Sequence, residues 1–326
     1  MISSAISSIR AQLVDRRIKL QDTVREIKSP ANLISLLNEV DSALERMDNG
    51  TYGLCEVCHD PIEDYRLQQD PLMKFCLDHL TTKQQKELEQ DLKLASKIQN
   101  TLLPRNNATV DGWEYFYHYE PAELVSGDYC DVVSTDKNSK KQFFIIGDVS
   151  GKGVAASMLM SHLHAMFHSL SSINLDVHDL VERANRLFCE STLSTHYSTL
   201  AIVLANKSGE VEICNAGHCA PLLIKKDQII KVDATGVPIG LFCSSEFGVN
   251  KYKLESGDSI FLYTDGLSEA HNHDQEYGEN RVMNVAEKIK TFQTKQMISA
   301  YTDDLTSFLS GSLKSDDLTM LAIKKL

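Results

Sequence analysis

The sequence predicts an α+β protein, with helices in its N-terminal third and a β-rich remainder in a chain of 326 residues. Two observations carry this prediction. Between Leu33 and Leu44, apolar residues recur at the three- and four-residue spacing of an amphipathic helix. Further along, short apolar runs adjoin turn-forming Gly and Asp residues, as strands do: Phe143–Ile146, Ile260–Tyr263 and Leu318–Ile323. These patterns place the helices first and the sheet afterwards.

The N-terminal third predicts a helical hairpin followed by a zinc site. A helix is expected from about residue 3 to 28, ending near Pro30, and the amphipathic helix follows it. Cys55-x2-Cys58 and Cys76-x2-His79 are separated by seventeen residues, a spacing that suits one tetrahedral Zn²⁺ site. Four unrelated buried residues are the alternative. His59 could compete as a ligand, but we favour His79 because it stands where a fourth cysteine would.

Thr81 to Leu103 predicts a further amphipathic helix, which Pro104 ends. Its apolar face consists of Leu88, Leu92, Ala95, Ile98 and Leu102. About three heptads are marginal for an isolated coiled coil, so pairing would need help from the flanking domains. We expect a homodimer; a helix that only packs on its neighbour is the alternative.

Four acidic segments lie where strands meet turns, and they point to a site for divalent cations. Carboxylates at strand ends, beside glycines that let the backbone approach closely, suit hard cations such as Mn²⁺ or Mg²⁺. Two such ions can activate a water and hold a phosphoryl group. Any one segment taken alone is better explained as a turn. The segments are Ser126–Tyr129, Gly147–Gly153, Thr264–Gly266 and Ser315–Thr319.

Charge and composition exclude several other classes. The net charge of −12 argues against broad nucleic-acid binding, which needs a basic face. No apolar run approaches the ~20 residues that span a bilayer, and no signal peptide is apparent, so a cytoplasmic protein without membrane attachment is expected. Eight cysteines are too few for a disulfide scaffold of this length.

The sequence in and around the acidic segments resembles the RsbU/SpoIIE branch of the metal-dependent, type 2C serine/threonine protein phosphatases. The resemblance runs from about Leu103 to the C-terminus and includes Asn215–Pro221 and Gly236–Gly240 in the family's order. It implies an α-β-β-α sandwich, in which two antiparallel sheets are flanked by helices. The chain is thereby divided into a regulatory module (1–80), a linker helix (81–105) and a phosphatase domain (106–326).

The same resemblance implies a role for each motif residue. Asp148 would bridge two Mn²⁺ or Mg²⁺ ions, beside the backbone carbonyl of Val149, and a water activated by both metals would attack the phosphorus. The other ligands would be Asp128, Asp265 and Asp316, with Asp317 orienting them and Gly151 and Lys152 touching substrate. Many relatives have histidine at the position of Lys152. Whether this lysine binds phosphate or only extends into solvent stays open, as does the proton donor.

The segment from Ala43 to Cys55, with Pro61-Ile62 and Pro71 further on, resembles the DksA/TraR zinc fingers. Members of that family can insert an acidic hairpin tip into RNA polymerase. The expected tip here, residues 26–32, has no aspartate pair, so we favour a sensor or dimerisation module. Oxidation of Cys55 or Cys58 would eject zinc, which makes a redox sensor a further hypothesis.

Histidines outside these motifs receive structural interpretations. For His218, structural support is favoured over a catalytic part. Surface or packing positions, rather than a metal cluster, are expected for His162, His164 and His168, and exposed loop positions for His271 and His273.

The function expected from the sequence is therefore a metal-dependent serine/threonine protein phosphatase. Its implied substrate is a phosphorylated STAS-type anti-anti-sigma-like protein. Regulation by the N-terminal zinc module is expected, and an upstream regulatory protein is a further candidate partner. Two alternatives come from other classes: a catalytically silent phosphatase-fold scaffold, and a DksA-like regulator of RNA polymerase.

Overall fold

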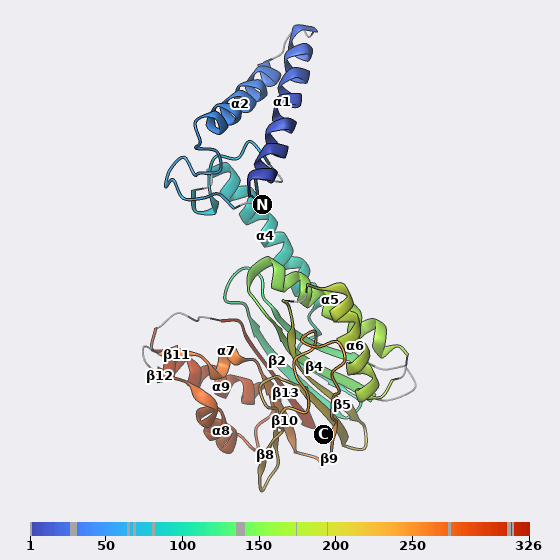
Figure 1. Ribbon diagram of the computed structural model, residues 1–326. Helices are drawn as coiled ribbons and strands as arrows, with labels where there is room; N and C mark the ends of the chain where they lie inside the picture. The colour runs from blue at the N-terminus through green and yellow to red at the C-terminus, as the bar shows by residue number, and fades with distance from the viewer. Residues whose placement is uncertain are drawn as a thin grey trace. The chain divides into compact units, whose positions relative to one another are not determined.

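The computed structural model (Figure 1) describes residues 2–26, 31–63, 66–67, 70–79, 82–134, 141–173, 175–193, 195–272, 275–311, 314 and 316–326. The chain divides into two compact units, Met1–Asp91 and Leu92–Leu326, and the division falls inside helix α4 (Thr82–Leu102). No helix in the described parts of the chain is long and apolar enough to cross a membrane.

The first unit is built on a pair of antiparallel helices, α1 (Ile2–Glu26) and α2 (Ala31–Asp48). Their apolar faces meet in a small core that contains Leu13 and Val40. An ion pair of 2.7 Å from Arg10 to Asp48 joins the first part of α1 to the end of α2, as the antiparallel arrangement requires. The centre of the expected hairpin tip, residues 27–30, lies outside the described residues.

The second unit contains two antiparallel sheets. Among the described residues, one sheet has six strands in the order β1 (Ala108–Val110), β2 (Trp113–Glu120), β13 (Leu318–Lys325), β10 (Ser259–Tyr263), β7 (Leu222–Ile224) and β8 (Ile229–Lys231). The other has five in the order β3 (Asp128–Ser134), β4 (Lys141–Val149), β5 (Ser198–Asn206), β6 (Glu210–Ala216) and β9 (Asn250–Lys253). A small ribbon pairs β11 (His271–Asn272) with β12 (Gln275–Glu276).

Each central strand is apolar on both faces, because both faces are covered. In β4, Phe144 and Ile146 point into the core between the sheets, whereas Phe143 and Ile145 point into the core beneath the helices. This alternation follows from the two-residue period of a strand. The continuous apolar runs of the sequence are therefore strands buried on two sides.

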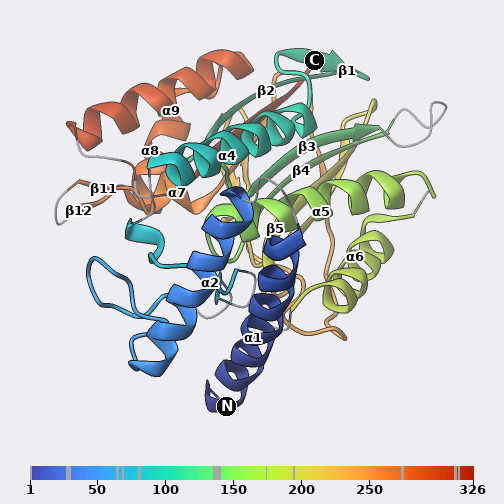
Figure 2. The same ribbon diagram turned by 90° about the horizontal axis from the view of Figure 1, so that it is seen from above.

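Helices cover the outer faces of the two sheets (Figure 2). On the five-stranded sheet lie α5 (Gly153–Ser171) and α6 (Val177–Ser191), whose apolar residues join those of β3 to β6. On the six-stranded sheet lie α7 (Asp265–Ser268), α8 (Gly278–Lys288) and α9 (Thr294–Leu309). The order helix, sheet, sheet, helix confirms the predicted α-β-β-α sandwich, preceded by a helical hairpin and a linker helix.

Candidate metal centres

Asp128 and Asp148 face each other across neighbouring strands. Asp128 begins β3 and Asp148 lies near the end of β4, and the antiparallel register makes their Cα atoms direct partners. Like charges directly opposite each other destabilise a sheet. A strand pair that places two carboxylates there therefore gains from a bound cation between them.

The other sheet holds the carboxylate of Asp128 through two hydroxyls. Asp128 is only 1% exposed, and its Oδ2 accepts hydrogen bonds from Thr264 Oγ1 at 2.9 Å and from Thr319 Oγ1 at 2.5 Å. The two threonines also bond each other, since the Thr319 amide donates to Thr264 Oγ1 at 3.0 Å. A carboxylate from one sheet is thus oriented by residues that follow β10 and begin β13 in the other.

Glycine allows Asp265 and the segment before β13 to approach each other. A Cβ at Gly266 would lie 1.9 Å from the backbone oxygen of Asp317. Any larger residue would force the two segments apart, and with them Asp265 and Asp316.

The negative charges of these carboxylates and their burial shift the pKa values within the group. Burial, and then the charges of Asp265 and Asp316, raises the pKa of Asp148 to about 7. Burial, and then Asp316, raises the pKa of Asp265 to about 6, and burial followed by the charge of Asp148 raises the pKa of Asp128 well above its usual range. Such mutual destabilisation is what divalent cations relieve, so the donor set fits Mn²⁺ or Mg²⁺.

The carboxylate of Asp317 accepts two hydrogen bonds from backbone amides. Its Oδ1 accepts from the Ala122 amide at 2.7 Å and its Oδ2 from the Gly127 amide at 2.9 Å. Asp317 therefore holds the loop that leads into Asp128. Lys152 is placed beside Asp316, 3.0 Å from its Oδ2.

Backbone geometry also brings Val149 and Gly151 to this end of the sheet. A Cβ at Gly127 would meet the Val149 carbonyl oxygen at 3.1 Å, so glycine keeps this carbonyl close to the loop that carries Asp128. Gly151 has a φ of +96° and open space around it, which suits a turn between β4 and α5.

A residue that sequence reasoning missed connects α4 to this site. Gln99 is 4% exposed, and its amide bonds the backbone of Ser126 twice: Nε2 donates to the carbonyl at 2.7 Å and Oε1 accepts from the amide at 3.0 Å. The Ser126 hydroxyl in turn accepts from the Asp128 amide at 3.0 Å. A polar residue amid a linker helix was the only signal in the sequence.

His218 supports the sheet from inside. It is buried, its Nδ1 lies 2.8 Å from Thr199 Oγ1, and burial lowers its pKa to about 4. The Thr199 hydroxyl lies 3.4 Å from the backbone carbonyl of Asp148. These surroundings favour a neutral imidazole at His218 with a structural role.

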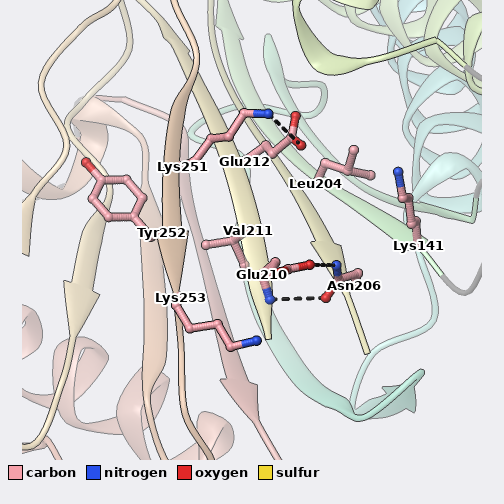
Figure 3. A pocket seen from close by; sticks show the side chains of 9 residues that line it. All are labelled: Lys141, Leu204, Asn206, Glu210, Val211, Glu212, Lys251, Tyr252 and Lys253. Atoms are coloured by element: carbon pink, nitrogen blue, oxygen red, sulfur yellow. Dashed lines mark hydrogen bonds and ion pairs between the residues drawn. The ribbon is translucent and has the colours of Figure 1, made fainter. Parts of the chain in front are cut away.

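A surface pocket of about 610 Å³ lies at the opposite end of the five-stranded sheet from Asp148 (Figure 3). Lys141 and Asn206 are strand partners there, whereas Asp148 pairs with Thr199 at the other end of the same strands. Lys251 and Glu212, which both line the pocket, form an ion pair. The pocket is separate from the carboxylate site.

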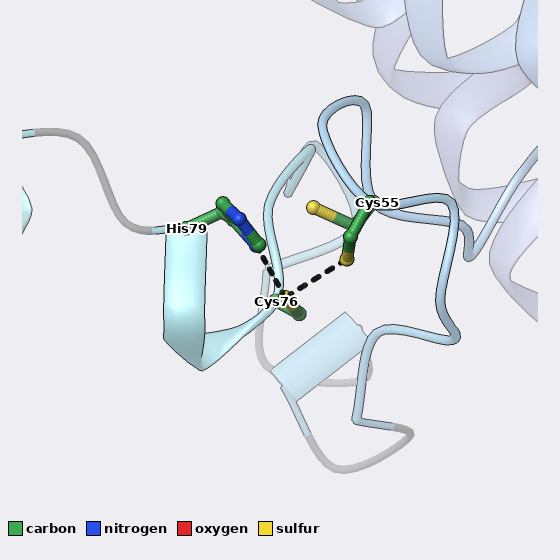
Figure 4. A group of neighbouring side chains, drawn as sticks. Cys55, Cys76 and His79 are labelled. Atoms are coloured by element: carbon green, nitrogen blue, oxygen red, sulfur yellow. Dashed lines mark hydrogen bonds between the residues drawn. The ribbon is translucent and has the colours of Figure 1, made fainter.

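The expected zinc ligands come together in the first unit. Ligand atoms of Cys55, Cys58, Cys76 and His79 all lie within 4.8 Å of one another, and Figure 4 shows the imidazole of His79 turned towards Cys76. The sulfurs of Cys58 and Cys76 are 3.7 Å apart. A tetrahedron with Zn–S bonds of ~2.3 Å has edges of about 3.8 Å, so the spacing fits zinc. His59 is not in the group; it has a φ of 60° and its amide closes the turn onto the Cys55 carbonyl.

Cys76→Ser is expected to remove one zinc ion per chain and unfold the segment around residues 50–79, because zinc binding in such small modules supplies the folding free energy. Zinc content by mass spectrometry and amide hydrogen exchange of the segment are the measurements. The matched control is Cys243→Ser, which changes an exposed cysteine of the second unit. Full zinc content in Cys76→Ser would contradict this ligand set.

Two family models match the chain. The model described as Stage II sporulation protein E (SpoIIE) matches residues 138–325, more than half of the chain. The model described as prokaryotic dksA/traR C4-type zinc finger matches residues 50–78. That description implies four cysteines, whereas this chain places His79 as the fourth ligand.

Individual proteins extend this similarity. Protein IcfG of Synechocystis is 25% identical over 264 residues, covering 72% of this chain and 41% of IcfG. Phosphoserine phosphatase RsbU of Bacillus subtilis is 23% identical over 244 residues, covering 74% of this chain and 72% of RsbU. The solved SiaA-PP2C domain of Pseudomonas aeruginosa superposes with a TM-score of 0.65 at 17% identity, covering 75% of this chain and 99% of that one. The chain therefore spans less than half the length of IcfG but most of RsbU.

Proposed function

The chain belongs to the SpoIIE family of serine/threonine protein phosphatases, and from that premise we propose that it hydrolyses phosphoserine or phosphothreonine in a signalling protein. The observation that carries the proposal is the meeting of carboxylates from both sheets. Asp128 and Asp148 come from adjacent strands of one sheet, and Asp265 and Asp316 adjoin neighbouring strands of the other. Burial, and then the charges of neighbouring carboxylates, raises the pKa values of Asp148 and Asp265, as is common at sites that bind cations.

In this proposal each residue has a separate task. Asp148, Asp265, Asp316 and the Val149 carbonyl would hold the ions from the ends of β4, β10 and β13. Asp128 would complete the ligand set, with its orientation set by Thr264 and Thr319. Asp317 keeps the loop before Asp128 in place through its two backbone hydrogen bonds. When bound, the two Mn²⁺ or Mg²⁺ ions lower the pKa of water and neutralise phosphate charge.

Lys152 is the cation best placed to meet an incoming phosphate. It lies in the loop before α5, next to Gly151, and its side chain is 58% exposed beside Asp316. An exposed ion pair of this kind contributes little to stability, ~0–1 kcal/mol, so Lys152 can leave Asp316 for a phosphate at little cost in folding free energy. We assign Lys152 to phosphate recognition as a charge and not to proton donation.

The substrate and partners are proposed from the relatives. RsbU is named a phosphoserine phosphatase. A phosphorylated STAS-type protein within a partner-switching pathway is the corresponding substrate here, with an upstream regulator and a homodimer formed through α4. Zinc in the N-terminal module would regulate the phosphatase through the same helix, because α4 begins shortly after His79 and contains Gln99.

Gln99→Leu is expected to weaken Mn²⁺ binding about 10- to 100-fold, the usual effect of losing a group that orients a ligand. Leucine removes both bonds to Ser126 and leaves two buried backbone groups unpaired, which loosens the segment before Asp128. The measurement is the Mn²⁺ concentration that gives half-maximal phosphate release. Asn100→Leu, an exposed neighbour on the same helix, is the control. Equal Mn²⁺ requirements in both variants would remove Gln99 from this role.

The proposed activity is tested by measuring Mn²⁺-dependent phosphate release from a phosphoserine-containing protein, with the zinc module fully loaded. Release that requires Mn²⁺ and stops on chelation supports the phosphatase. If neither the full chain nor residues 92–326 alone releases phosphate, the scaffold alternative is favoured. A polymerase pull-down that depends on the helical hairpin would favour the DksA-like alternative.

A further inference from the structure

One group of potential ligands lies outside both centres described above. Asp131 on β3 and two histidines of α5, His164 and His168, bring their ligand atoms within 4.8 Å of one another. Asp131 Oδ2 lies 2.9 Å from His168 Nε2 and 3.1 Å from His164 Nδ1. The sequence suggested packing or surface positions for these histidines, because nothing in their own helix pointed to Asp131.

The periodicities of strand β3 and helix α5 explain why these three side chains lie close together. Asp131 is three positions after Asp128 in β3, so the two side chains lie on opposite faces of the sheet. Asp131 shares the face of Tyr129 and Val133, which pack against the helices. His164 and His168 are four residues apart and occupy one face of α5, with ring centroids 4.2 Å apart. The group is therefore separated from the carboxylate centre by the sheet itself.

The carboxylate of Asp131 is buried and anchored as a ligand would be. Its side chain is 3% exposed, its Oδ1 accepts from the Val132 amide at 2.7 Å, and its Oδ2 accepts from the Tyr129 hydroxyl at 2.9 Å. A buried charge of this kind requires a compensating cation or several donors. The half-exposed His168 opens the group to solvent on one side.

Hydrogen bonding within the group does not account for Nδ1 of His164. Its Nδ1 is buried and makes no hydrogen bond within the described structure, although the carboxylate is 3.1 Å away. An N–H bond on His164 Nδ1 would therefore not point well enough at Asp131 Oδ2 to form a hydrogen bond. A cation bound by both atoms would use the nitrogen lone pair instead.

We propose that Asp131, His164 and His168 form an additional transition-metal site, with Zn²⁺ as the ion that it takes. Two imidazoles and one carboxylate, with water in a fourth position, are a common donor set for zinc. Tetrahedral Zn–N and Zn–O bonds of ~2.0–2.1 Å place ligand atoms about 3.3–3.4 Å apart. The distances of 2.9 and 3.1 Å from Asp131 Oδ2 to the two imidazole nitrogens therefore need to lengthen by only a few tenths of an ångström. Each imidazole binds in its neutral form, with its proton on the other ring nitrogen.

A metal at this position would fasten α5 to β3. Because α5 starts at Gly153, directly after the loop with Gly151 and Lys152, such an ion would restrain the helix that follows the proposed substrate loop. The consequence is a zinc-dependent rise in thermal stability that is independent of the cysteine site.

The test counts zinc in the full chain after dialysis against buffered Zn²⁺ with excess Mg²⁺ to occupy the carboxylate centre. Two zinc ions per chain are expected in the wild type and in Asp148→Asn. One is expected in His168→Gln, in His164→Gln and in Cys76→Ser. The matched control is His162→Gln on the same helix, which keeps both ions because its Nε2 contacts Ser191 at 2.8 Å and lies outside the group.

Thermal unfolding provides a second readout. In the Cys76→Ser background, Zn²⁺ is expected to raise the Tm of the second unit, and adding His168→Gln is expected to abolish that rise. One zinc ion in the wild type, two in both His164→Gln and His168→Gln, or loss of zinc in His162→Gln as well would each overturn the proposal.

Discussion

Asp148→Asn is expected to lower Mn²⁺-dependent phosphate release at least about 100-fold, because loss of a residue that only orients a ligand already costs 10- to 100-fold. The amide keeps the shape of the side chain but removes the charge that faces Asp128 across the strand pair. Folding is expected to be retained, since a repulsive contact between like charges disappears at the same time. Phosphate release at saturating Mn²⁺, with circular dichroism to verify folding, is the measurement.

Asp303→Asn is the matched control, because it removes one negative charge at an exposed position of α9. Wild-type activity in Asp303→Asn shows that net charge alone is not responsible. Activity within a few-fold of wild type in Asp148→Asn would mean that the reaction does not depend on this carboxylate.

Gly266→Ala is expected to abolish Mn²⁺-dependent activity and to lower the Tm. The added Cβ would lie 1.9 Å from the Asp317 backbone oxygen, and backbone cannot move aside as the end of a flexible side chain can. Overpacking of this kind costs about 1–3 kcal/mol, and the displacement would separate Asp265 from Asp316. Activity and thermal unfolding, measured on the same preparation, test both consequences.

Gly257→Ala serves as the comparison for this variant. Gly257 has a φ of +98°, but a Cβ added there would meet nothing within 4 Å, so alanine adds conformational strain without a clash. Normal Mn²⁺-dependent activity is expected with a small loss of stability. If Gly266→Ala behaved like Gly257→Ala, the close approach of the two segments would not be needed for catalysis.

Individual strands could be predicted because their signals are local, whereas the sandwich itself was implied by the family resemblance. The runs at Phe143–Ile146 and Leu318–Ile323 are apolar at nearly every position, which is what strands buried on both faces require, and both are central strands. The four candidate zinc ligands could also be predicted from the sequence, since their spacing is short and paired. Glycines next to the aspartates signalled a close backbone approach, and Gly266 has one.

Other parts of the sites depend on sheet register between distant segments. Thr264 and Thr319 reach Asp128 from 136 and 191 residues away, and no pattern in the sequence relates such positions. Gln99 looked like one polar residue in an amphipathic helix, yet it bonds the backbone of Ser126. The Asp131 group was missed for the same reason, because its members lie on a strand and a helix that meet only in the folded sandwich.

The most direct test of the central interpretation is the number of Mn²⁺ ions that the full chain binds, measured by electron paramagnetic resonance titration with zinc already in place. We predict two bound ions per wild-type chain, and one or none in Asp148→Asn. A wild-type chain that binds no Mn²⁺, or an Asp148→Asn variant that binds as many ions with the same affinity, would contradict a two-metal centre at these carboxylates.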